Sequence, residues 1–522
     1  MQDNFYQLDS YDVADSVAET HRTAAADVLD SDSYGHLIGG EWVESEEGET
    51  GPAIDPTTGE TLATIQIGTA ADVDRAVDAA REALTGTWGE LSPKQRGEKL
   101  EEIAERLAAR QADIAKIDSL EAGKPNMHSR FVDSEVMLEQ FRYFAALART
   151  ADQGRLIPTN HQKRAFTRRE PYGVVGAISA WNFPAMFVAW KLGPALAGGN
   201  AVVFKPSTKT VLSSLTIGRI CDRVLPSGTV NIVTGPGSEV GAAISAHEGI
   251  DKVTLTGSKG AGIAAMKSAA ETITPVSTEL GGKSPNIVFP DADLEKAVEG
   301  TMVGIFFNSG QQCTAGSRLF LHEDIREEFL DRLLRRVEEL TVGDPLSPMT
   351  DIGPMIDHDH RDDVLSYIDG AKADGATVLA GGDRDETFAG GKESETAGAP
   401  FVPPTVLADV DDDDTVACEE VFGPVLTVLE WSNREEVIRR ANDTRFGLAA
   451  ALWTENLNDA HEVAAELEAG TVWVNTYNDL LDPGPHGGYK ESGIGRELAE
   501  EALDDYTQTK QVKINLGDVP KF

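Results

Sequence analysis

One of the three cysteines in this chain lies in a loop-forming stretch. Cys313 is part of FFNSGQQCTAGSR (306–318), where Gly, Ser, Gln and Thr surround it. A free cysteine usually behaves as a small buried hydrophobe, so Cys313 alone would be considered inert, but a polar, turn-rich setting favours a reactive thiol. A nucleophilic thiol needs a lowered pKa and partner residues that activate its substrate. The sequence therefore predicts nucleophilic chemistry at Cys313 if such partners exist.

Candidate partners follow short apolar, β-branched runs that begin after Pro171. The runs and the residues after them are GVVGAIS (173–179) before Trp181 and Asn182, AVVF (201–204) before Lys205, and VTLT (253–256) before Gly257 and Ser258. In an open parallel sheet, ligands bind outside the carboxyl ends of the strands. A helix that begins at Gly-Ser also offers free backbone N–H groups to a phosphate. We interpret these strand ends as one binding site, although each residue alone could belong to an ordinary polar loop.

Glu279, the segment that contains Glu420 and Phe422, and one glycine-rich stretch are weaker candidates for the site. Glu279 in TELGGKSPN would alone be a surface or capping carboxylate. Phe422, which follows Glu420 in EEVFGPV, would alone be a core residue. GPGSEVG (235–241) is similar to a dinucleotide-binding fingerprint, but its spacing is G-x-G-x-x-x-G. These residues therefore gain weight only in combination.

The elements that must position these residues have α/β character. Apolar residues recur at three- and four-residue spacing over 71–150, which predicts surface helices. The β-branched runs continue with VNIV (230–233) and NIVF (286–289), and helix-like stretches separate several of them. This alternation predicts a parallel sheet of buried strands. A second α/β region is expected from about residue 282.

The N-terminal part of the chain has two expected features. HLIGGEWVES (36–45) predicts a hairpin, because a Gly-Gly pair lies between two short apolar runs. Residues 1–33 are polar and acidic, with modest helical spacing around Val13, Val17 and Ala24. We expect this segment to be an extension outside the main fold.

The composition indicates a large globular protein with an unusual charge. A chain of 522 residues, of which 41% are hydrophobic, exceeds the size of one hydrophobic core, so two or three domains are expected. Acidic residues outnumber basic ones by 87 to 46, which gives a net charge of −41 at pH 7. Such a charge repels nucleic acid, and when spread over the chain it is a device used by halophiles. We therefore expect no nucleic-acid partner and a halophilic source.

The cysteine content and the hydrophobicity along the chain indicate the cellular compartment of the protein. Three scattered cysteines do not form a disulfide framework, and no Cys/His cluster indicates a metal site. The N-terminus lacks the basic and apolar regions of a signal peptide, and no stretch approaches the roughly 18 uninterrupted apolar residues of a membrane span. We expect a soluble cytoplasmic protein with no metal and no membrane partner.

Seven stretches together resemble the NAD(P)-dependent aldehyde dehydrogenase superfamily. They are PYGVVGAISAWNFP, GNAVVFKPS, LTGS, ELGGKSPNIVF, FFNSGQQCTAGSR, EEVFGPV and GGYKESGIGRE (487–497). Their order and approximate spacing match this superfamily over about residues 36 to 516. The resemblance implies an α/β fold with a Rossmann-like cofactor-binding domain, a second α/β catalytic domain and a small β domain that bridges subunits. The expected boundaries are an N-terminal extension at 1–35, the cofactor-binding domain at 36–150 and 172–281, the catalytic domain at 282–491, and bridging segments at 151–171 and 500–522.

The resemblance implies oxidation of an aldehyde to the free carboxylic acid with NAD or NADP. In this chemistry a thiolate adds to the carbonyl, hydride leaves for nicotinamide, and water cleaves the resulting thioester. Cys313 matches the nucleophile, and Asn182 matches the donor that stabilises the oxyanion together with the Cys313 N–H. Glu279 matches the base that activates water, and Lys191 matches a further position near the active site. Because relatives that transfer the acyl group to coenzyme A typically lack the carboxylate of Glu279, we expect hydrolysis.

The resemblance also implies the cofactor contacts. The expected residues are Trp181, Lys205, Ser207, Thr208, Lys209, Gly237, Gly257, Ser258, Glu420 and Phe422. Lys205 and Glu420 match residues that hold ribose hydroxyls, Ser258 matches a pyrophosphate contact, and Phe422 matches a residue beside the nicotinamide. NAD-preferring relatives often carry Glu at the position of Thr208, where it would repel a 2′-phosphate. With Thr208 in that place and Lys209 beside it, we expect NADP to be accepted and, on this argument, preferred.

A third group of residues is expected to set substrate choice. It comprises Phe183, Met186, Trp190, Gln312, Thr314, Leu480 and His486. Relatives often have Phe at the position of His486, so the aldehyde channel should be more polar here. None of the seven is Arg, which argues weakly against a dicarboxylic semialdehyde.

Three alternatives remain open. The chain could be a succinate-semialdehyde or other ω-semialdehyde dehydrogenase, a catalytically silent relative that only binds, or a cysteine hydrolase without a nucleotide. The silent reading is disfavoured because Cys313, Glu279 and Asn182 are all present. The hydrolase reading is disfavoured by Lys205 and Glu420 and by the missing His partner near the cysteine.

Two long alternating stretches indicate self-association. HQKRAFTRREP (161–171) and DYTQTKQVKINLG (505–517) resemble the strands of the bridging domain. Such long strands leave an exposed edge that a monomer would need to protect. We therefore expect a homodimer or a homotetramer.

Overall fold

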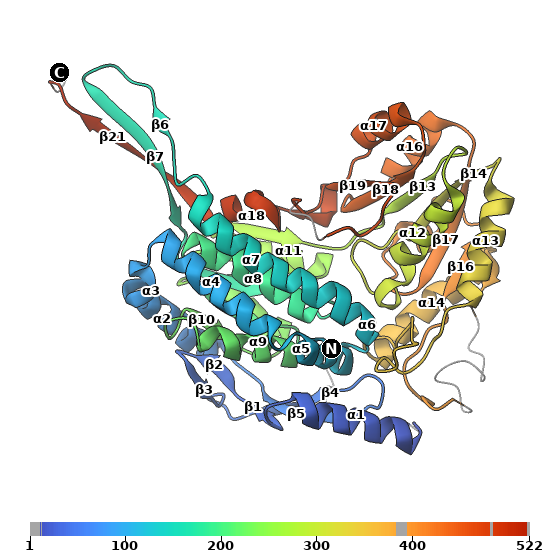
Figure 1. The fold of residues 1–522 in the computed structure, drawn as a ribbon, viewed down its shortest axis with the longest axis horizontal. Coiled ribbons are helices and arrows are strands. Elements are labelled where there is room, and N and C mark those ends of the chain that lie inside the picture. The colour runs from blue at the N-terminus through green and yellow to red at the C-terminus, as the bar shows by residue number, and fades with distance from the viewer. Residues whose placement is uncertain (1–10, 12, 383–393, 481–483, 519–522) are drawn as a thin grey trace.

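The computed structural model describes residues 11, 13–382, 394–480 and 484–518, and it consists of two lobes and a protruding arm (Figure 1). An eight-stranded sheet forms the centre of one lobe and a seven-stranded sheet forms the centre of the other. Most neighbouring strands in both sheets are parallel, and helices connect them. The predicted α/β class is confirmed.

The first sheet contains the strand ends that the sequence singled out. Its strands, in spatial order, are β20 (Gly493–Ile494), β12 (Val276–Glu279), β11 (Lys252–Thr256), β8 (Val174–Ile178), β9 (Ala201–Lys205), β10 (Val230–Ile232), β2 (His36–Ile38) and β3 (Glu41–Val43). From β8 the chain adds β9 and β10 on one side, and then returns to add β11 and β12 on the other. The order therefore reverses between β8 and β11, which is where ligands bind in such sheets.

Both faces of this sheet are buried, because successive apolar residues of each strand belong to opposite cores. Val175 and Phe204 belong to one core, whereas Val174 and Val203 belong to the core of the opposite face. Successive side chains of a strand point to opposite faces, so a parallel strand covered on both sides is apolar throughout. One face is covered by α4 (Pro93–Ala108), α5 (Gln111–Ala122), α7 (Ser134–Thr150), α8 (Pro184–Gly198) and α9 (Leu212–Asp222), and the other by α2 (Ala70–Thr85), α10 (Ala242–Ala246) and α11 (Lys259–Ala270).

Helix α8 is buried on all sides. All of its residues are buried, and Lys191 is its one charged residue. A helix that is apolar all round needs protein on every side, which α7, α4 and the sheet provide. A buried lysine in this position must have a partner, and that partner belongs to the site described below.

The second lobe begins where the sequence predicted a second α/β region. Its strands, in spatial order, are β15 (Thr377–Ala380), β16 (Thr405–Ala408), β17 (Val425–Trp431), β14 (Arg318–His322), β13 (Pro285–Val288), β18 (Ala449–Trp453) and β19 (Thr471–Val474). The helices around it are α12 (Leu294–Phe306), α13 (Arg326–Glu338), α14 (His358–Asp374), α16 (Arg434–Asn442) and α17 (Leu457–Glu466). The loop between α12 and β14 carries Cys313.

The predicted hairpin is present, and the N-terminal segment corrects an expectation. Strands β2 and β3 pair antiparallel, and both glycines of the turn have the left-handed φ that Gly adopts most readily. Helix α1 (Asp15–Val28), however, packs against α5 and buries His21, Ala24 and Val28. The expectation that residues 1–33 lie outside the main fold was therefore wrong for α1. A polar composition hid six buried positions of the helix.

The arm is a three-stranded antiparallel sheet. It consists of β6 (Leu156–Ile157), β7 (Lys163–Pro171) and β21 (Thr507–Asn515), with β7 in the centre. Strands β7 and β21 pair over nine residues and extend away from both lobes (Figure 1). The two stretches that resembled bridging strands thus form one protruding element.

In the part of the chain that the structure describes, no helix combines the length and the apolar character needed to cross a membrane.

Candidate active site

The loop that carries Cys313 is tightly folded. Asn308, Ser309 and Gly310 have successive φ values of 51°, 55° and 72°, and a Cβ on Gly310 would lie 2.1 Å from the Gly423 carbonyl oxygen. Left-handed backbone is common for Asn and Gly, so the sequence suits this turn. Gly282, which follows β12, also lies close to this loop. A Cβ on Gly282 would lie 2.6 Å from the Cys313 carbonyl oxygen. The nucleophile loop is therefore held by close backbone contacts.

The pKa of the Cys313 thiol differs from the one that the sequence predicted. Burial raises the pKa of the Cys313 thiol well above its usual value, and the carboxylates of Glu279 and Glu420 raise it further. The chemistry predicted for Cys313 requires a lowered pKa, whereas the charges of two nearby acids raise the pKa of the thiol. A thiol with this pKa is protonated at neutral pH and must lose its proton when it reacts.

Asn182 is tied to the same loop. Its side-chain amide donates a hydrogen bond to the Gln311 carbonyl oxygen over 3.0 Å. In return, the Asn308 amide donates to the Asn182 carbonyl oxygen over 3.1 Å. These two bonds join the end of β8 to the loop before Cys313. One N–H of the Asn182 amide remains available for a further acceptor.

Glu279 lies at the carboxyl end of β12, and the residue is 2% exposed. One of its oxygens, Oε1, has no hydrogen-bond partner within the described residues and lies 3.7 Å from His486 Nε2. Burial raises the pKa of Glu279 well above its usual range, with a further contribution from the nearby carboxylate of Glu497. A carboxyl group with a raised pKa is a stronger base once it is ionised.

Lys191 is used differently from the other predicted catalytic residues. Its ammonium forms an ion pair with Glu497 and donates a hydrogen bond of 3.0 Å to Thr254 Oγ1. All three groups are buried. The lysine therefore compensates a buried carboxylate behind Glu279, and the prediction of a role near the active site stays a prediction.

The end of β9 and the segment before β17 present groups that fit a nucleotide. Lys205 is 4% exposed, burial lowers its pKa to about 8, and its ammonium has no hydrogen-bond or ion-pair partner among the described residues. Glu420 accepts a hydrogen bond of 3.1 Å from the Gly282 N–H, and burial raises its pKa to about 7. An unpaired buried ammonium and a carboxylate with a free oxygen suit the hydroxyls of a ribose.

The predicted phosphate-side residues are open to ligands. Ser258 is exposed and begins the 12-residue helix α11, where its hydroxyl accepts a hydrogen bond of 3.3 Å from the Ala261 N–H. Gly257 precedes it at the end of β11, and a Cβ on Gly237 would meet nothing within 4 Å. This start of a helix can receive an anion. The residues present therefore fit a dinucleotide.

Trp181 and Phe422 lie together across the lobe boundary. Their rings are 5.4 Å apart at an angle of 80°, and His360 Nε2 donates a hydrogen bond of 2.8 Å to the Phe422 carbonyl oxygen. Phe422 has a φ of 58°, an uncommon value for a bulky residue. The rigid backbone here holds the ring beside Trp181.

The loop after β9 contains Ser207, Thr208 and Lys209. Ser207 Oγ accepts a hydrogen bond of 3.3 Å from the Lys209 N–H. The Lys209 ammonium forms an ion pair with Asp357, which caps α14 in the second lobe. The charge that was expected to attract a 2′-phosphate therefore already has a carboxylate partner.

The predicted substrate residues fall into two groups. Phe183, Met186 and Trp190 form a buried apolar cluster with Leu480 packed against it, and the His486 ring lies 5.2 Å from the Trp190 ring. Gln312 and Thr314 instead flank Cys313, and both are bonded to Asn478. Asn478 Nδ2 donates to Gln312 Oε1 over 2.7 Å, and Thr314 Oγ1 donates to Asn478 Oδ1 over 2.9 Å.

Four residues around this site were not predicted from the sequence. They are Asn308, His360, Asn478 and Glu497. The two asparagines have positive φ, so their presence in loops was a signal. Glu497 is the last residue of the motif GGYKESGIGRE, but only the structure shows that it pairs with Lys191.

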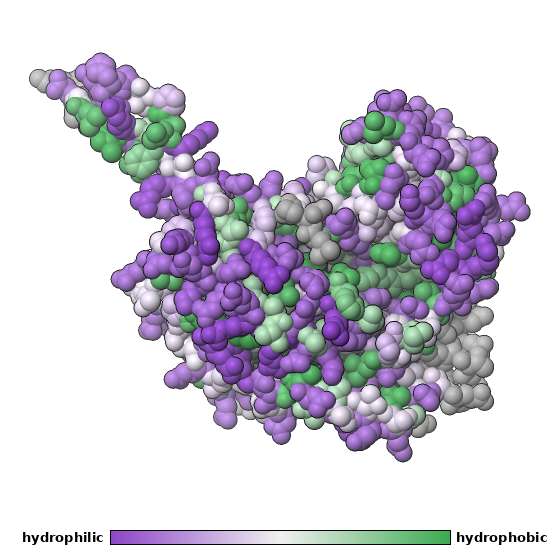
Figure 2. Space-filling model, in the orientation of Figure 1, coloured by the Kyte–Doolittle hydropathy of each residue, from purple (hydrophilic) through white to green (hydrophobic). Residues whose placement is uncertain are grey.

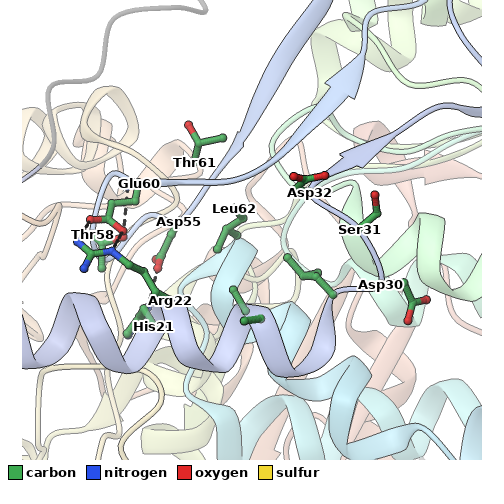
Figure 3. Close-up of a pocket in the computed structure, with 13 residues that line it drawn as sticks. His21, Arg22, Asp30, Ser31, Asp32, Asp55, Thr58, Glu60, Thr61 and Leu62 are labelled. Carbon is green, nitrogen blue, oxygen red and sulfur yellow. Dashed lines mark hydrogen bonds and ion pairs between the residues drawn. The ribbon is translucent and has the colours of Figure 1, made fainter.

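A separate cavity of about 360 Å³ lies between α1 and the strand β5 (Thr61–Gln66) (Figure 3). His21, Arg22, Asp30, Asp55 and Glu60 are among its lining residues, and no predicted site residue lines it. Arg22 is paired with Glu60. This cavity is therefore distinct from the site around Cys313.

Comparisons with known proteins identify the family to which this chain belongs. The family model described as "Aldehyde dehydrogenase family" matches residues 42–512. The provisionally named aldehyde dehydrogenase DhaS of Bacillus subtilis (strain 168) is 44% identical over 483 residues, which cover 92% of this chain and 95% of that protein.

Two solved structures are similar over almost the whole chain. The NAD⁺ complex of an aldehyde dehydrogenase from Bacillus cereus is 40% identical with a TM-score of 0.90, and the match covers 98% of this chain and 100% of that one. The betaine aldehyde dehydrogenase of Staphylococcus aureus in complex with NAD⁺ is 37% identical with a TM-score of 0.92, and the match covers 96% and 98%. The chain thus belongs to the aldehyde dehydrogenase family, and it is an NAD(P)-dependent oxidoreductase that oxidises aldehydes.

Proposed function

We propose that this enzyme oxidises an aldehyde to the free carboxylic acid through a thiohemiacetal and a thioester on Cys313. The observation that supports this most directly is the meeting of three distant segments: Cys313 from the α12–β14 loop, Asn182 from the end of β8 and Glu279 from the end of β12. These are the nucleophile, the oxyanion donor and the base that the reaction requires.

In the first half-reaction, the Cys313 sulfur bonds to the aldehyde carbon, the carbon–oxygen double bond opens to an oxyanion, and the thiol proton passes to water. The free N–H of Asn182 and the Cys313 backbone N–H then stabilise the negative carbonyl oxygen. The nicotinamide cofactor supplies the acceptor for the hydride that leaves this carbon. Lys205, Glu420 and Ser258 would hold the cofactor, and Trp181 and Phe422 would flank it.

In the second half-reaction, water cleaves the thioester. Glu279 takes a proton from water, the oxygen bonds to the acyl carbon, and the carbon–sulfur bond breaks to release the acid. A buried carboxyl group with a raised pKa is suited to this proton transfer. Efficient acyl transfer to coenzyme A would contradict the hydrolytic assignment.

We propose that NADP is accepted beside NAD, because Thr208 places no carboxylate where a 2′-phosphate would lie. Pairing of Lys209 with Asp357 weakens the additional argument for an NADP preference. The residues in this region are Ser207, Thr208 and Lys209, with Gly237 and Gly257 on the phosphate side.

The argument for the substrate class comes from the residues expected to line the substrate channel. Phe183, Met186 and Trp190 favour an apolar substrate body, and His486 adds one polar group. An ω-semialdehyde dehydrogenase is the second candidate, but none of the predicted substrate residues is Arg.

Self-association through the arm is also proposed. The arm exposes apolar side chains at Leu156 (84% exposed), Ile514 (45%) and Leu516 (60%), and Figure 2 shows hydrophobic patches along it. A long protruding sheet with exposed apolar residues suits pairing with another subunit. Sedimentation at equilibrium should give a dimer or tetramer, whereas a monomer at micromolar concentration would contradict the proposal. A cytoplasmic location and a halophilic source likewise stay predictions. So do the domain boundaries at 36–150 with 172–281, 282–491, and 151–171 with 500–522, whereas the extension at 1–35 is corrected by the packing of α1 against α5.

The experiment that tests the proposed function is reduced-nicotinamide formation from NAD or NADP in molar KCl. The aldehyde panel should include aliphatic aldehydes, succinate semialdehyde and betaine aldehyde, and Cys313→Ala serves as the matched variant. We expect turnover in the wild type and none in the variant. Equal rates in both, or folded wild type that binds nucleotide without reducing it, would contradict the mechanism.

A further inference from the structure

One ion pair joins the two lobes beside the residues expected to contact the cofactor. The Lys209 ammonium, from the loop between β9 and α9, pairs with the Asp357 carboxylate at the start of α14 in the second lobe. The two side chains are 40% and 26% exposed, respectively. Water therefore still reaches both groups, and a ligand with a negative charge can compete for the ammonium.

Asp357 is held in this place by its helix. Its Oδ1 accepts a hydrogen bond of 2.8 Å from the His360 N–H, as the side chain of an N-cap does. The His360 ring lies 5.5 Å from the Trp181 ring, and His360 Nε2 donates to the Phe422 carbonyl oxygen over 2.8 Å. The start of α14 is thus anchored to two of the expected cofactor residues, so the carboxylate stays beside them.

Lys209 is tied to the same surroundings from the first lobe. Its N–H donates a hydrogen bond of 3.3 Å to Ser207 Oγ, and the Thr210 hydroxyl donates one of 3.1 Å to the Trp181 carbonyl oxygen. The Lys209 ammonium lies 6.0 Å from the centre of the Trp181 ring. The loop therefore brings a cation next to Thr208, where a 2′-phosphate is expected to lie.

This cation is the one that a 2′-phosphate would need. Lys209 is the only basic residue between Lys205 and Arg219. A phosphate group carries up to two negative charges and binds Lys and Arg through charge-assisted hydrogen bonds. Because Asp357 already occupies the ammonium, the phosphate must displace a carboxylate and then remain close to it.

We propose that Asp357 is a specificity-determining residue for the cofactor, because it withholds the Lys209 ammonium from a 2′-phosphate and so disfavours NADP relative to NAD. This inference rests on the proposed function, which assigns the adenosine ribose to the neighbourhood of Thr208. The discriminating carboxylate then comes from the second lobe and not from the loop after β9. The absence of Glu at position 208 alone therefore does not set the preference.

The experiment measures binding with two ligands that differ only by a 2′-phosphate. These are adenosine 5′-monophosphate and adenosine 2′,5′-bisphosphate, titrated calorimetrically into the full chain at one KCl concentration. Asp357→Asn removes the charge but keeps an oxygen that can cap α14. We expect this variant to shift the ratio of the two dissociation constants roughly 5-fold or more in favour of the bisphosphate. The ratio of kcat/KM for NADP and NAD should shift in the same direction.

Two further variants separate the ion pair from the overall charge. Asp359→Asn removes an exposed carboxylate from the first turn of the same helix, and this matched control should keep the wild-type ratio. Combining Lys209→Gln with Asp357→Asn should abolish the gain, because the released ammonium is the group that attracts the phosphate.

Two results would overturn the proposal. One is an unchanged ratio in a folded Asp357→Asn enzyme, with or without an equal weakening of both ligands, which would show that the ion pair only joins the lobes. The other is a gain that persists in full without Lys209. Failure of the proposed function is recognised separately, since the wild type would then bind neither NAD nor adenosine 5′-monophosphate, or Cys313→Ala would still reduce NAD with an aldehyde.

Discussion

The Asn182 side chain donates a hydrogen bond of 3.0 Å to the carbonyl oxygen of Gln311, although 129 residues separate the two in the chain. This bond sets the distance between the carboxyl end of β8 and the loop that carries Cys313. It also orients the amide, so that its second N–H can meet a negatively charged oxygen formed beside the sulfur.

We predict that Asn182→Ala lowers kcat by about 10²- to 10³-fold, as expected when one preorganised oxyanion donor is lost. Asn182→Asp should be at least as slow, because a carboxylate repels the developing charge. Steady-state kinetics with a melting curve of each variant provide the measurement. A kcat within a factor of two of wild type in a folded Asn182→Ala enzyme would exclude the assigned role.

A second prediction concerns Glu420 and the pH dependence of cofactor binding. Its pKa is raised to about 7 by burial, so the carboxylate that would hold the ribose hydroxyls is lost as the pH falls through 7. We expect KM for the cofactor to rise between pH 8 and pH 6, and Glu420→Gln to show a high KM without this dependence. Glu419→Gln, at the neighbouring position, is the control. An unchanged KM profile in Glu420→Gln would refute the prediction.

A third prediction concerns the buried His21, which joins three parts of the chain. His21 Nδ1 lies 2.6 Å from Asp55 Oδ2 and its Nε2 lies 2.9 Å from Asp344 Oδ1. Although burial opposes protonation, hydrogen bonds to both carboxylates raise its pKa from 6.5 to about 10. A raised folded-state pKa means that the stabilisation is complete below pH 6.5 and is lost as the pH rises through 10.

Over this window the free energy of unfolding should fall by up to about 1.4 kcal/mol per pH unit through His21. His21→Gln should remove this dependence and destabilise the protein by roughly 3 kcal/mol at pH 6, because it leaves two buried or half-buried carboxylates without their cation. Melting temperatures from pH 6 to 10, with His461→Gln as control, provide the measurement. Parallel pH profiles for wild type and His21→Gln would show that the interaction carries no net stability.

The choice between NAD and NADP can be tested at Thr208. We predict that Thr208→Glu lowers kcat/KM for NADP by roughly 10-fold or more while that for NAD changes little, since a carboxylate repels the 2′-phosphate. Thr208→Gln, of similar size but without charge, should keep the wild-type ratio. If Thr208→Glu leaves the ratio of the two kcat/KM values unchanged, the 2′-phosphate does not lie near this loop.

The net charge of −41 leads to a prediction about salt. At 1 M salt the screening length is about 3 Å, so the mutual repulsion of surface carboxylates is largely removed. We expect activity and melting temperature to rise from low salt to molar KCl and then to level off. Activity that declines steadily over the same range would contradict a halophilic adaptation.

The sequence alone determined the fold class and supplied the candidate residues of the site. Strands β8, β9, β10, β11 and β13 lie where the apolar β-branched runs predicted them, because strands buried on both faces must be apolar at every position. The strand-end residues Asn182 and Lys205 were recognisable for a related reason, since parallel strands bring their carboxyl ends to one edge of the sheet. Local pattern and the family motifs were sufficient for both.

Only the tertiary structure decided which groups neutralise one another. The ion pairs join residues from different lobes or distant segments. They are Lys191 with Glu497, Lys209 with Asp357 and His21 with Asp344. The tertiary structure likewise placed His486 beside Glu279 and gave the Cys313 thiol a raised pKa. Burial and through-space charge depend on distances that no local pattern contains, so the protonation states of the site could not be read from the sequence.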